Sequence, residues 1–360
     1  MIQQLRAAGV VLSLLGMTVA QGAVPAKNAF LVLVDGLRWQ EVFGGADREL
    51  LTKEVVGEKE LPGLEKKWWR ESADERRELL MPFLWSTVAK KGQIFGNQNK
   101  GSVARVTNGL NFSYPGYSEM TVGYSDPRIN SNDKKPNPNV TVFEWLHKKP
   151  EFAGQVAAFG VWDVVPFIVN RERAGFPVNA CTEPLEIDPM PKELLLLNTL
   201  KTEIPQRWPG AVHDALEFRT MMLYVREKKP RVVWFTFGET DEFGHDVKYG
   251  EYLAAAQRTD AFLRELWATL ESQPEYAGKT TLIVCADHGR GNPPKEWSSH
   301  GRDIKGSEGI WIAMLGPTTA PLGERTNHEP VWQAQVAATL AAALGEDFTT
   351  AHQKVRPPLK

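Results

Sequence analysis

Residues 281–289 read TLIVCADHG, and this stretch decides the fold. Its first six residues are apolar or β-branched, which is the composition of a buried strand, and the run ends abruptly at Asp287 and His288. Carboxylates and imidazoles are common metal ligands in proteins. The stretch therefore predicts a buried strand that carries two ligand side chains at its C-terminal tip.

Two further apolar runs end in the same way. Residues 30–34 (FLVLV) stop at Asp35, and residues 232–237 (VVWFTF) lead into a segment that contains Asp241 and His245. The carboxyl ends of parallel strands meet at one edge of a sheet, where open α/β sheets bind their ligands. We therefore expect one parallel sheet with one site at its carboxyl edge.

The rest of the chain alternates between predicted strands and predicted helices, which favours a doubly wound α/β fold. Residues 162–209 contain several prolines and no clean period, so we expect an inserted cap over the edge of the sheet. Residues 48–91 carry dense charge of both signs, which is typical of a solvated helical surface. Further strands are expected at residues 93–95, 155–159 and 309–315, and helices at 141–148, 211–228, 250–273 and 331–344.

The N-terminus has the order of a secretory signal. Arg6 is followed by an apolar segment, residues 7–20, and then by small residues at positions 22 and 23. The apolar segment is too short for a bilayer helix. We therefore expect a signal peptide at residues 1–23, a catalytic domain at residues 24–360 without a membrane span, and a periplasmic or secreted protein.

Composition sets the broad limits. With 360 residues, 42% of them hydrophobic, the chain can bury a large core. Its formal net charge of −2 and its lack of a basic stripe argue against a nucleic-acid-binding surface. Of the two cysteines, Cys285 lies in a predicted strand and Cys181 in an irregular stretch, and a disulfide between them stays an open question.

Six side chains form the candidate ligand set. Three of the seven histidines, namely His245, His288 and His300, lie in glycine-rich segments after predicted strands. Carboxylates and imidazoles without a thiolate suit zinc, or else manganese, and six ligands suffice for two ions with open positions. Two ions about 4 Å apart can stabilise both oxygens of a displacement at phosphorus. The full set is Asp35, Asp241, His245, Asp287, His288 and His300.

Ser113 is the candidate nucleophile. It precedes Pro115, and this pair is typical of the first turn of a helix. A hydroxyl there faces unpaired backbone N–H groups, which favour a bound anion, although simple capping would explain the same pattern. A hydroxyl bound to a metal ion is acidified and becomes a competent nucleophile. Ser118 is the second candidate and Thr107 the third.

These motifs, in this order, resemble the alkaline phosphatase superfamily, and most closely its nucleotide pyrophosphatase/phosphodiesterase and metalloenzyme branches. The resemblance covers most of the chain after residue 23 and implies a three-layer αβα sandwich with a mostly parallel central sheet. It also implies two metal sites and a phosphoseryl intermediate. One site would be formed by Asp35, Asp287, His288 and Ser113, and the other by Asp241, His245 and His300.

Departures from the family pattern bear on the substrate. By this resemblance, phosphodiesterase relatives have an asparagine three residues after the nucleophile, where this chain has Gly116. We therefore expect Asn111, a backbone N–H or a basic side chain such as Arg302 to hold the phosphoryl oxygen. Trp162 is a further candidate contact, for the leaving group. Neither cysteine has the motif of the sulfatases, which argues against sulfate-ester hydrolysis by their mechanism.

The sequence thus predicts an exported two-metal hydrolase of small phosphate esters, and it leaves the choice between monoester and diester open. One alternative is a phosphoryl transferase, as in mutase relatives, although export argues against it. Another is a binding module that kept the fold and lost catalysis. Six intact ligands count against that module, because buried ligand side chains are costly to keep without a metal.

Overall fold

The computed structural model of the chain describes residues 24–359, and the predicted signal peptide lies outside them. Within this range one sheet contains eight strands, and all but β9 run parallel to a neighbour. Their order across the sheet is β10 (Gly323–Glu324), β2 (Gln93–Phe95), β9 (Ile312–Leu315), β7 (Thr280–Ala286), β1 (Asn28–Val34), β6 (Val232–Phe237), β4 (Val156–Gly160) and β5 (Val178–Ala180).

The register of the central strands aligns their C-terminal ends. Val34, the last residue of β1, lies opposite Phe237 of β6 and Ala286 of β7. Every residue of these three strands is buried, which explains their continuous apolar sequences. The residues that follow each strand therefore emerge side by side at one edge, as the sequence predicted.

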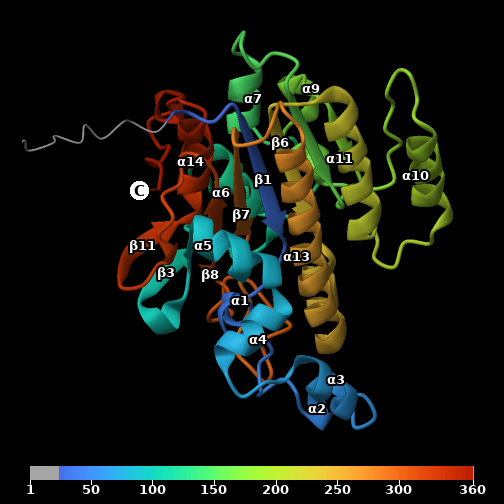
Figure 1. Cartoon of the computed structure of the whole chain (residues 1–360), viewed down its shortest axis with the longest axis vertical. Helices are drawn as coiled ribbons and strands as arrows, with labels where there is room; N and C mark the ends of the chain where they lie inside the picture. The colour runs from blue at the N-terminus through green and yellow to red at the C-terminus, as the bar shows by residue number, and fades with distance from the viewer. Residues whose placement is uncertain (1–23, 360) are drawn as a thin grey trace, which may run out of the picture.

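Helices cover both faces of this sheet, which gives the predicted three-layer αβα sandwich (Figure 1). The layer on one face contains α6 (Ser113–Val122), α7 (Val142–His147) and α14 (Val336–Ala343). The layer on the other face contains α11 (Asp214–Lys228) and the long helix α13 (Tyr249–Ser272). The short helix α12 (Glu239–His245) lies between β6 and α13 in the chain and packs against α13.

Residues 48–91 form several short helices rather than one long helical surface. In Figure 1, the first helices of this region extend from the end of the molecule that carries α1 (Trp39–Gly44), whereas its last helix packs beside the sheet. No helix within residues 24–359 combines the length and the apolar character that crossing a membrane requires. The short helices are α2 (Lys53–Val56), α3 (Leu61–Trp68), α4 (Ala73–Leu80), the π-helical turn η1 (Leu84–Val88) and α5 (Ala89–Lys91).

The C-terminal part departs from the expected boundaries. The predicted strand at 309–315 is two strands, because β8 (Gly309–Ile310) joins a second sheet with β3 (Ser102–Arg105) and β11 (His328–Trp332), whereas β9 joins the main sheet. The predicted helix at 331–344 begins as a strand, since Val331 and Trp332 pair with β3. Such residues fit a strand well once a partner strand is in reach, and this partner was not visible in the sequence. Short 3₁₀ turns lie at Gln98–Lys100, Gln333–Gln335 and Phe348–Thr350.

Residues 162–209 contribute to the sheet itself, in addition to any role as a cap. Strand β5 pairs with β4 and forms one edge of the main sheet. Both cysteines are buried free thiols, so the structure contains no Cys181–Cys285 disulfide. The helices of this region are α8 (Val165–Ile168), α9 (Arg171–Ala174) and α10 (Lys192–Glu203), and α10 packs against α11.

Candidate metal centre and nucleophile

Three ligand side chains meet where β1 and β7 end. The Nε2 atom of His288 lies 3.3 Å from Oδ1 of Asp35 and 3.2 Å from Oδ2 of Asp287. All three residues are buried. The aligned ends of two neighbouring parallel strands thus deliver two carboxylates and one imidazole to a single point.

The other atoms of these side chains are held by the protein. Tyr117 donates its hydroxyl to Oδ2 of Asp35 at 2.8 Å, and the backbone N–H of Gly36 donates to Oδ1 of Asp287 at 3.1 Å. Nδ1 of His288 lies 2.9 Å from the carbonyl oxygen of Gly289, to which it can only donate. This hydrogen bond leaves Nε2 of the neutral ring with a lone pair.

The three converging atoms have no hydrogen-bond partner among the described residues. They are Oδ1 of Asp35, Oδ2 of Asp287 and Nε2 of His288, and all are buried. Buried acceptors without a donor are costly, so a group of them facing one another requires a cation. The chemistry of this donor set, with oxygen and imidazole nitrogen at one point, therefore fits a divalent metal ion.

A second ligand group adjoins the first. Asp241 and His245 lie one turn apart on α12, with 3.0 Å between Oδ2 of Asp241 and Nε2 of His245. The Nε2 atoms of His245 and His300 are also 3.0 Å apart. Nδ1 of His300 lies 3.1 Å from the carbonyl oxygen of Asn111, so Nε2 is left as the acceptor atom. His245 was expected in a glycine-rich segment, and this segment forms a helix whose i, i+4 spacing brings His245 beside Asp241.

The two groups form one continuous cluster. Nε2 of His288 lies 3.8 Å from Oδ1 of Asp241, and the ligand atoms of Asp241, His288 and His300 lie within 4.8 Å of one another. The ligand atoms of Asp35, Asp287 and His288 also lie within 4.8 Å of one another. All six predicted ligands are therefore brought together at the carboxyl edge of the sheet.

Arg290 fixes the position of Asp241 within this cluster. It is fully buried, and its guanidinium donates to the side chain of Asp241, to the backbone carbonyl of Asp241 at 2.7 Å and to that of Ser298 at 2.6 Å. Arg290 is not among the described residues that line the cavity beside Ser113. Its donors instead fix Asp241 in place.

The charges of the cluster shift the pKa values of its members. Burial and then the neighbouring Asp35 raise the pKa of Asp287. Burial opposes protonation of His288, but Asp287 and Asp35 outweigh it and raise that pKa to about 9. Burial and then the charge of His288 lower the pKa of His300 to about 2. The raised pKa values of Asp287 and His288 express an excess of negative charge around His288, which a bound cation would balance.

A cavity of about 330 Å³ opens onto the cluster, and Ser113 lines it together with Asp35, Asp241, His245 and His300. Ser113 is the first residue of α6, after Phe112, and its hydroxyl makes no hydrogen bond within residues 24–359. The hydroxyls of the two other candidates are engaged elsewhere. That of Ser118 accepts from Asn137 at 3.0 Å, and that of Thr107 donates to Glu119 at 2.7 Å.

Only one of the four predicted substrate contacts lines the cavity. Trp162 lines the cavity, whereas Asn111, Gly116 and Arg302 are not among the described residues that line it. The side chain of Asn111 donates to Ser307 at 3.2 Å, and Arg302 is exposed.

Position 116 is glycine for a steric reason. A Cβ atom there would collide with the backbone carbonyl of Asp287, so an asparagine cannot occupy this position unless the backbone directly after β7 moves.

Three polar residues of the cavity were not among the predicted site residues, namely Tyr117, Asn132 and Glu242. Oδ1 of Asn132 accepts the backbone N–H of Tyr114 at 3.0 Å, which leaves its amide nitrogen free of any described partner. Burial and then the charge of Asp241 raise the pKa of Glu242 to about 7. Asn132 lies in a polar loop with no motif, so the sequence carried no signal for it.

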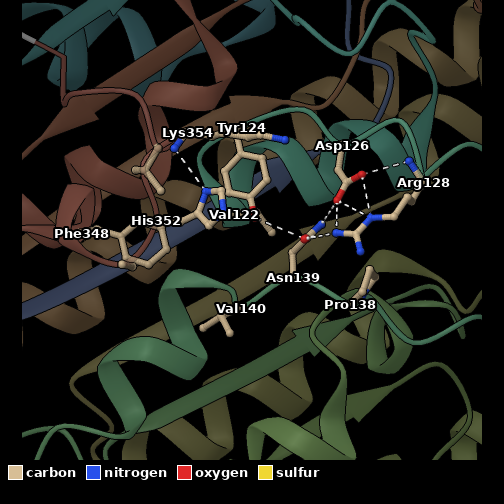
Figure 2. Close-up of a pocket in the computed structure, with 12 residues that line it drawn as sticks. Val122, Tyr124, Asp126, Arg128, Pro138, Asn139, Val140, Phe348, His352 and Lys354 are labelled. Carbon is tan, nitrogen blue, oxygen red and sulfur yellow. Dashed lines mark hydrogen bonds and ion pairs between the residues drawn. The ribbon is translucent and has the colours of Figure 1, made fainter.

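Figure 2 shows a second cavity, of about 240 Å³, beside the C-terminal end of α6. Its carboxylate, Asp126, is paired with Arg128 and Asn139, and Tyr124 stacks on His352 with ring centroids 4.8 Å apart. The polar groups shown there satisfy one another. The cavity beside Ser113, with its unpaired ligand atoms, is therefore the better candidate for chemistry.

Solved structures with the same fold include three enzymes of low sequence identity. The lipoteichoic acid synthase LtaP from Listeria monocytogenes matches with a TM-score of 0.57 and 11% identity, over 91% of this chain and 74% of the other. The alkaline phosphatase PafA matches with a TM-score of 0.56 and 11% identity, over 91% and 97%. A phosphonate monoester hydrolase of Agrobacterium radiobacter matches with a TM-score of 0.53 and 12% identity, over 89% and 74%.

A search of curated protein sequences gave no match. In contrast, the family model described as type I phosphodiesterase / nucleotide pyrophosphatase matches residues 42–305. This range is more than half of the chain and contains Ser113 and every candidate ligand except Asp35. The chain therefore belongs to the type I phosphodiesterase / nucleotide pyrophosphatase family of the alkaline phosphatase superfamily, a group of enzymes that hydrolyse or transfer phosphoryl esters.

Proposed function

We propose that this protein hydrolyses phosphodiesters at two divalent metal ions, with Ser113 as the nucleophile. The observation that carries the proposal is the convergence of three unpaired buried atoms, from Asp35, Asp287 and His288, beside a cavity that the unbonded hydroxyl of Ser113 also lines. Asp35, Asp287 and His288 would hold one ion, together with Ser113. Asp241, His245 and His300 would hold the other, and the ligand set favours zinc, or else manganese.

When bound, such ions supply Lewis-acid stabilisation of the oxygens around phosphorus and make a coordinated hydroxyl acidic. The residues of the chain then do the following work. Ser113 Oγ attacks phosphorus and loses its proton, the bond between phosphorus and one alcohol oxygen breaks, and that alcohol leaves. Water then cleaves the bond between phosphorus and Ser113 Oγ, which releases a phosphate monoester and restores the hydroxyl.

Two features of the chain suit the negative charge that develops on the phosphoryl oxygens. Ser113 begins α6, so the first N–H groups of a ten-residue helix lie nearby. The free amide nitrogen of Asn132 is oriented by the hydrogen bond between its Oδ1 and the N–H of Tyr114. We infer that Asn132 donates to a phosphoryl oxygen, which is the role first considered for Asn111 and Arg302.

The lining of the cavity favours a diester over a monoester. A monoester dianion carries one more negative charge than a diester and is usually held by additional Arg or Lys side chains. No Arg or Lys is among the described residues that line this cavity, and Glu242 adds a carboxylate to it. The order of residues in positions 1–23 supports export, so we infer that the enzyme acts in the periplasm or outside the cell.

The test is a comparison of initial rates on bis(4-nitrophenyl) phosphate, 4-nitrophenyl phosphate and 4-nitrophenyl sulfate. We expect the diester to be hydrolysed fastest, by about tenfold over the monoester, with little turnover of the sulfate. Chelation should abolish the activity, and zinc or manganese should restore it. Turnover that survives complete chelation, or none on either phosphate ester, would refute the proposal.

A further inference from the structure

Glu119 is a buried carboxylate on α6, and it binds the turn that precedes this helix. Its side chain is fully buried. Both of its oxygens accept the backbone N–H of Thr107 at 2.9 Å, and Oε1 also accepts the Thr107 hydroxyl at 2.7 Å. Its Oε2 accepts the backbone N–H and the side-chain amide of Asn108, each at 2.9 Å. Four donor groups of two successive residues are therefore fixed to one carboxylate.

Asn108 binds the backbone of the residues that follow it. Its Oδ1 accepts the backbone N–H of Leu110 at 2.8 Å and that of Asn111 at 2.9 Å. Asn111 has a φ of 55°, in the left-handed region that residues other than glycine seldom adopt. The hydrogen bonds of Asn108 therefore stabilise an uncommon backbone conformation at Asn111.

The carbonyl group of Asn111 orients a candidate metal ligand. It accepts a hydrogen bond from Nδ1 of His300 at 3.1 Å, which leaves Nε2 of that ring for an ion. The side-chain amide of Asn111 also donates to Ser307 at 3.2 Å, so the residue is held on two sides. A continuous series of hydrogen bonds therefore leads from Glu119 through the turn at residues 107–111 to His300.

The first ligand group is oriented by other contacts. Nδ1 of His288 bonds to the carbonyl group of Gly289, the next residue in the chain. Asp287 accepts the backbone N–H of Gly36. Neither bond involves residues 107–111. The turn therefore orients a member of the second ligand group, and the hydrogen bonds of the first group do not depend on it.

We propose that Glu119 is a positioning residue for the second metal site and acts through the turn at residues 107–111. The inference rests on the proposed function, because it needs an ion held by Asp241, His245 and His300. A glutamine at position 119 has nearly the same shape, but its NH₂ group would replace one of the two accepting oxygens. Replacing a group that orients a metal-binding histidine typically weakens metal binding by about 10- to 100-fold.

The experiment measures the affinity of each ion by itself. Protein stripped with a chelator is titrated with zinc against a competing chromophoric chelator, which gives one Kd for each site. In Glu119→Gln we expect one Kd to rise by about 10- to 100-fold and the other to stay unchanged. His245→Ala removes a member of the second ligand group. Adding Glu119→Gln to His245→Ala should therefore leave the Kd of the remaining ion unchanged.

Two further variants separate positioning from a general loss of stability. Asn108→Ala interrupts the series one step later, at a half-buried residue, and should raise the same Kd even if Glu119→Gln does not fold. Glu144→Gln is the matched control, because Glu144 is a fully buried carboxylate on α7 that pairs with Arg173 and Lys148. It should lower the thermal midpoint and keep both Kd values.

Three results would count against the inference. Unchanged Kd values in Asn108→Ala and in folded Glu119→Gln, beside a wild type that binds two ions, would overturn this inference alone. A weaker remaining ion after Glu119→Gln is added to His245→Ala would also overturn it, since the effect would not be confined to the second site. A wild type that binds fewer than two ions would overturn the proposed function and this inference together.

Discussion

The carboxylates that follow β1 and β7 are buried, and so is the ion pair that joins α10 to α11, but only the ion pair matches each carboxylate with a cation of its own. Lys201 Nζ lies 2.5 Å from Oε2 of Glu217, and both side chains are fully buried. Lys201 also donates to Asn179 at 2.8 Å. At the sheet edge, Asp35 and Asp287 converge on the single imidazole nitrogen Nε2 of His288, so that two carboxylates share at most one positive charge.

This difference separates a structural use of buried charge from a functional one. Lys201 and Glu217 match one positive charge with one negative charge and join α10 to α11, although neither carboxylate oxygen of Glu217 makes a hydrogen bond. The sheet-edge cluster is incomplete within residues 24–359, and its missing component must be positive. Burial alone therefore says little about function, whereas an unbalanced buried group points to a ligand.

The largest expected effect concerns the hydroxyl beside the unbalanced cluster. Ser113→Ala should lower kcat on bis(4-nitrophenyl) phosphate by at least about 10³-fold, because the nucleophile is lost. Metal content should be retained, since at least three ligands remain in each group. Steady-state rates and metal analysis measure both quantities.

Ser118→Ala is the matched control, because Ser118 lies on the same helix and is bound to Asn137. It should keep most of the activity. An active Ser113→Ala variant beside an inactive Ser118→Ala variant would transfer the role of nucleophile to Ser118.

The second prediction concerns stability with and without metal. A ligand that binds only the folded state at about 1,000 times its Kd adds about 4 kcal/mol to the free energy of unfolding. Zinc should therefore raise the thermal midpoint of the chelated protein, and Asp287→Asn should lose most of this rise. Scanning calorimetry at fixed free zinc measures it. An equal rise in Asp287→Asn would contradict the role of the buried ligand group.

The third prediction concerns the balanced pair. Lys201→Met leaves Glu217 buried without a partner and should lower the free energy of unfolding by about 3–5 kcal/mol. The double variant Lys201→Met/Glu217→Leu should recover most of this loss and keep the stabilisation by zinc. Denaturant titration measures the free energy of unfolding of each variant. If the double variant is no more stable than Lys201→Met, the unpaired charge of Glu217 is not the cause of the loss.

The smallest expected effect is on the pH dependence of stability. Burial raises the pKa of Glu217 from 4.5 to about 7, although Lys201 opposes the shift. The folded protein therefore binds the proton more tightly than the unfolded chain does, so this contribution to stability is complete below about pH 4.5 and is lost as the pH rises to about 7. The slope for one such group is at most about 1.4 kcal/mol per pH unit.

Glu217→Gln should flatten the pH profile of the unfolding free energy between pH 4.5 and 7, relative to the wild type. Glu203→Gln, which changes an exposed carboxylate at the end of α10, is the control and should leave the slope unchanged. Identical slopes in Glu217→Gln and the wild type would mean that Glu217 stays ionised throughout.

Local patterns in the sequence were enough to predict the fold and to select the six side chains that the structure brings together at the sheet edge. Asp35 and Asp287 could be found because a buried parallel strand is a continuous apolar run with a sharp end. Asn132 could not, because only the tertiary fold brings its loop to the start of α6. The burial of Arg290 against Asp241 depends on tertiary contacts, so the sequence did not indicate it. The helical position of His245 was also difficult to predict, because a glycine precedes it.

The most direct test of the account is the number of metal ions bound per chain. Wild type and His245→Ala protein should be stripped with a chelator, reloaded with zinc, freed of excess ion and analysed by mass spectrometry of the metal. The account predicts about two ions in the wild type and about one in His245→Ala, since only the second ligand group loses a member. About one ion or fewer in the wild type, or an unchanged number in His245→Ala, would contradict it.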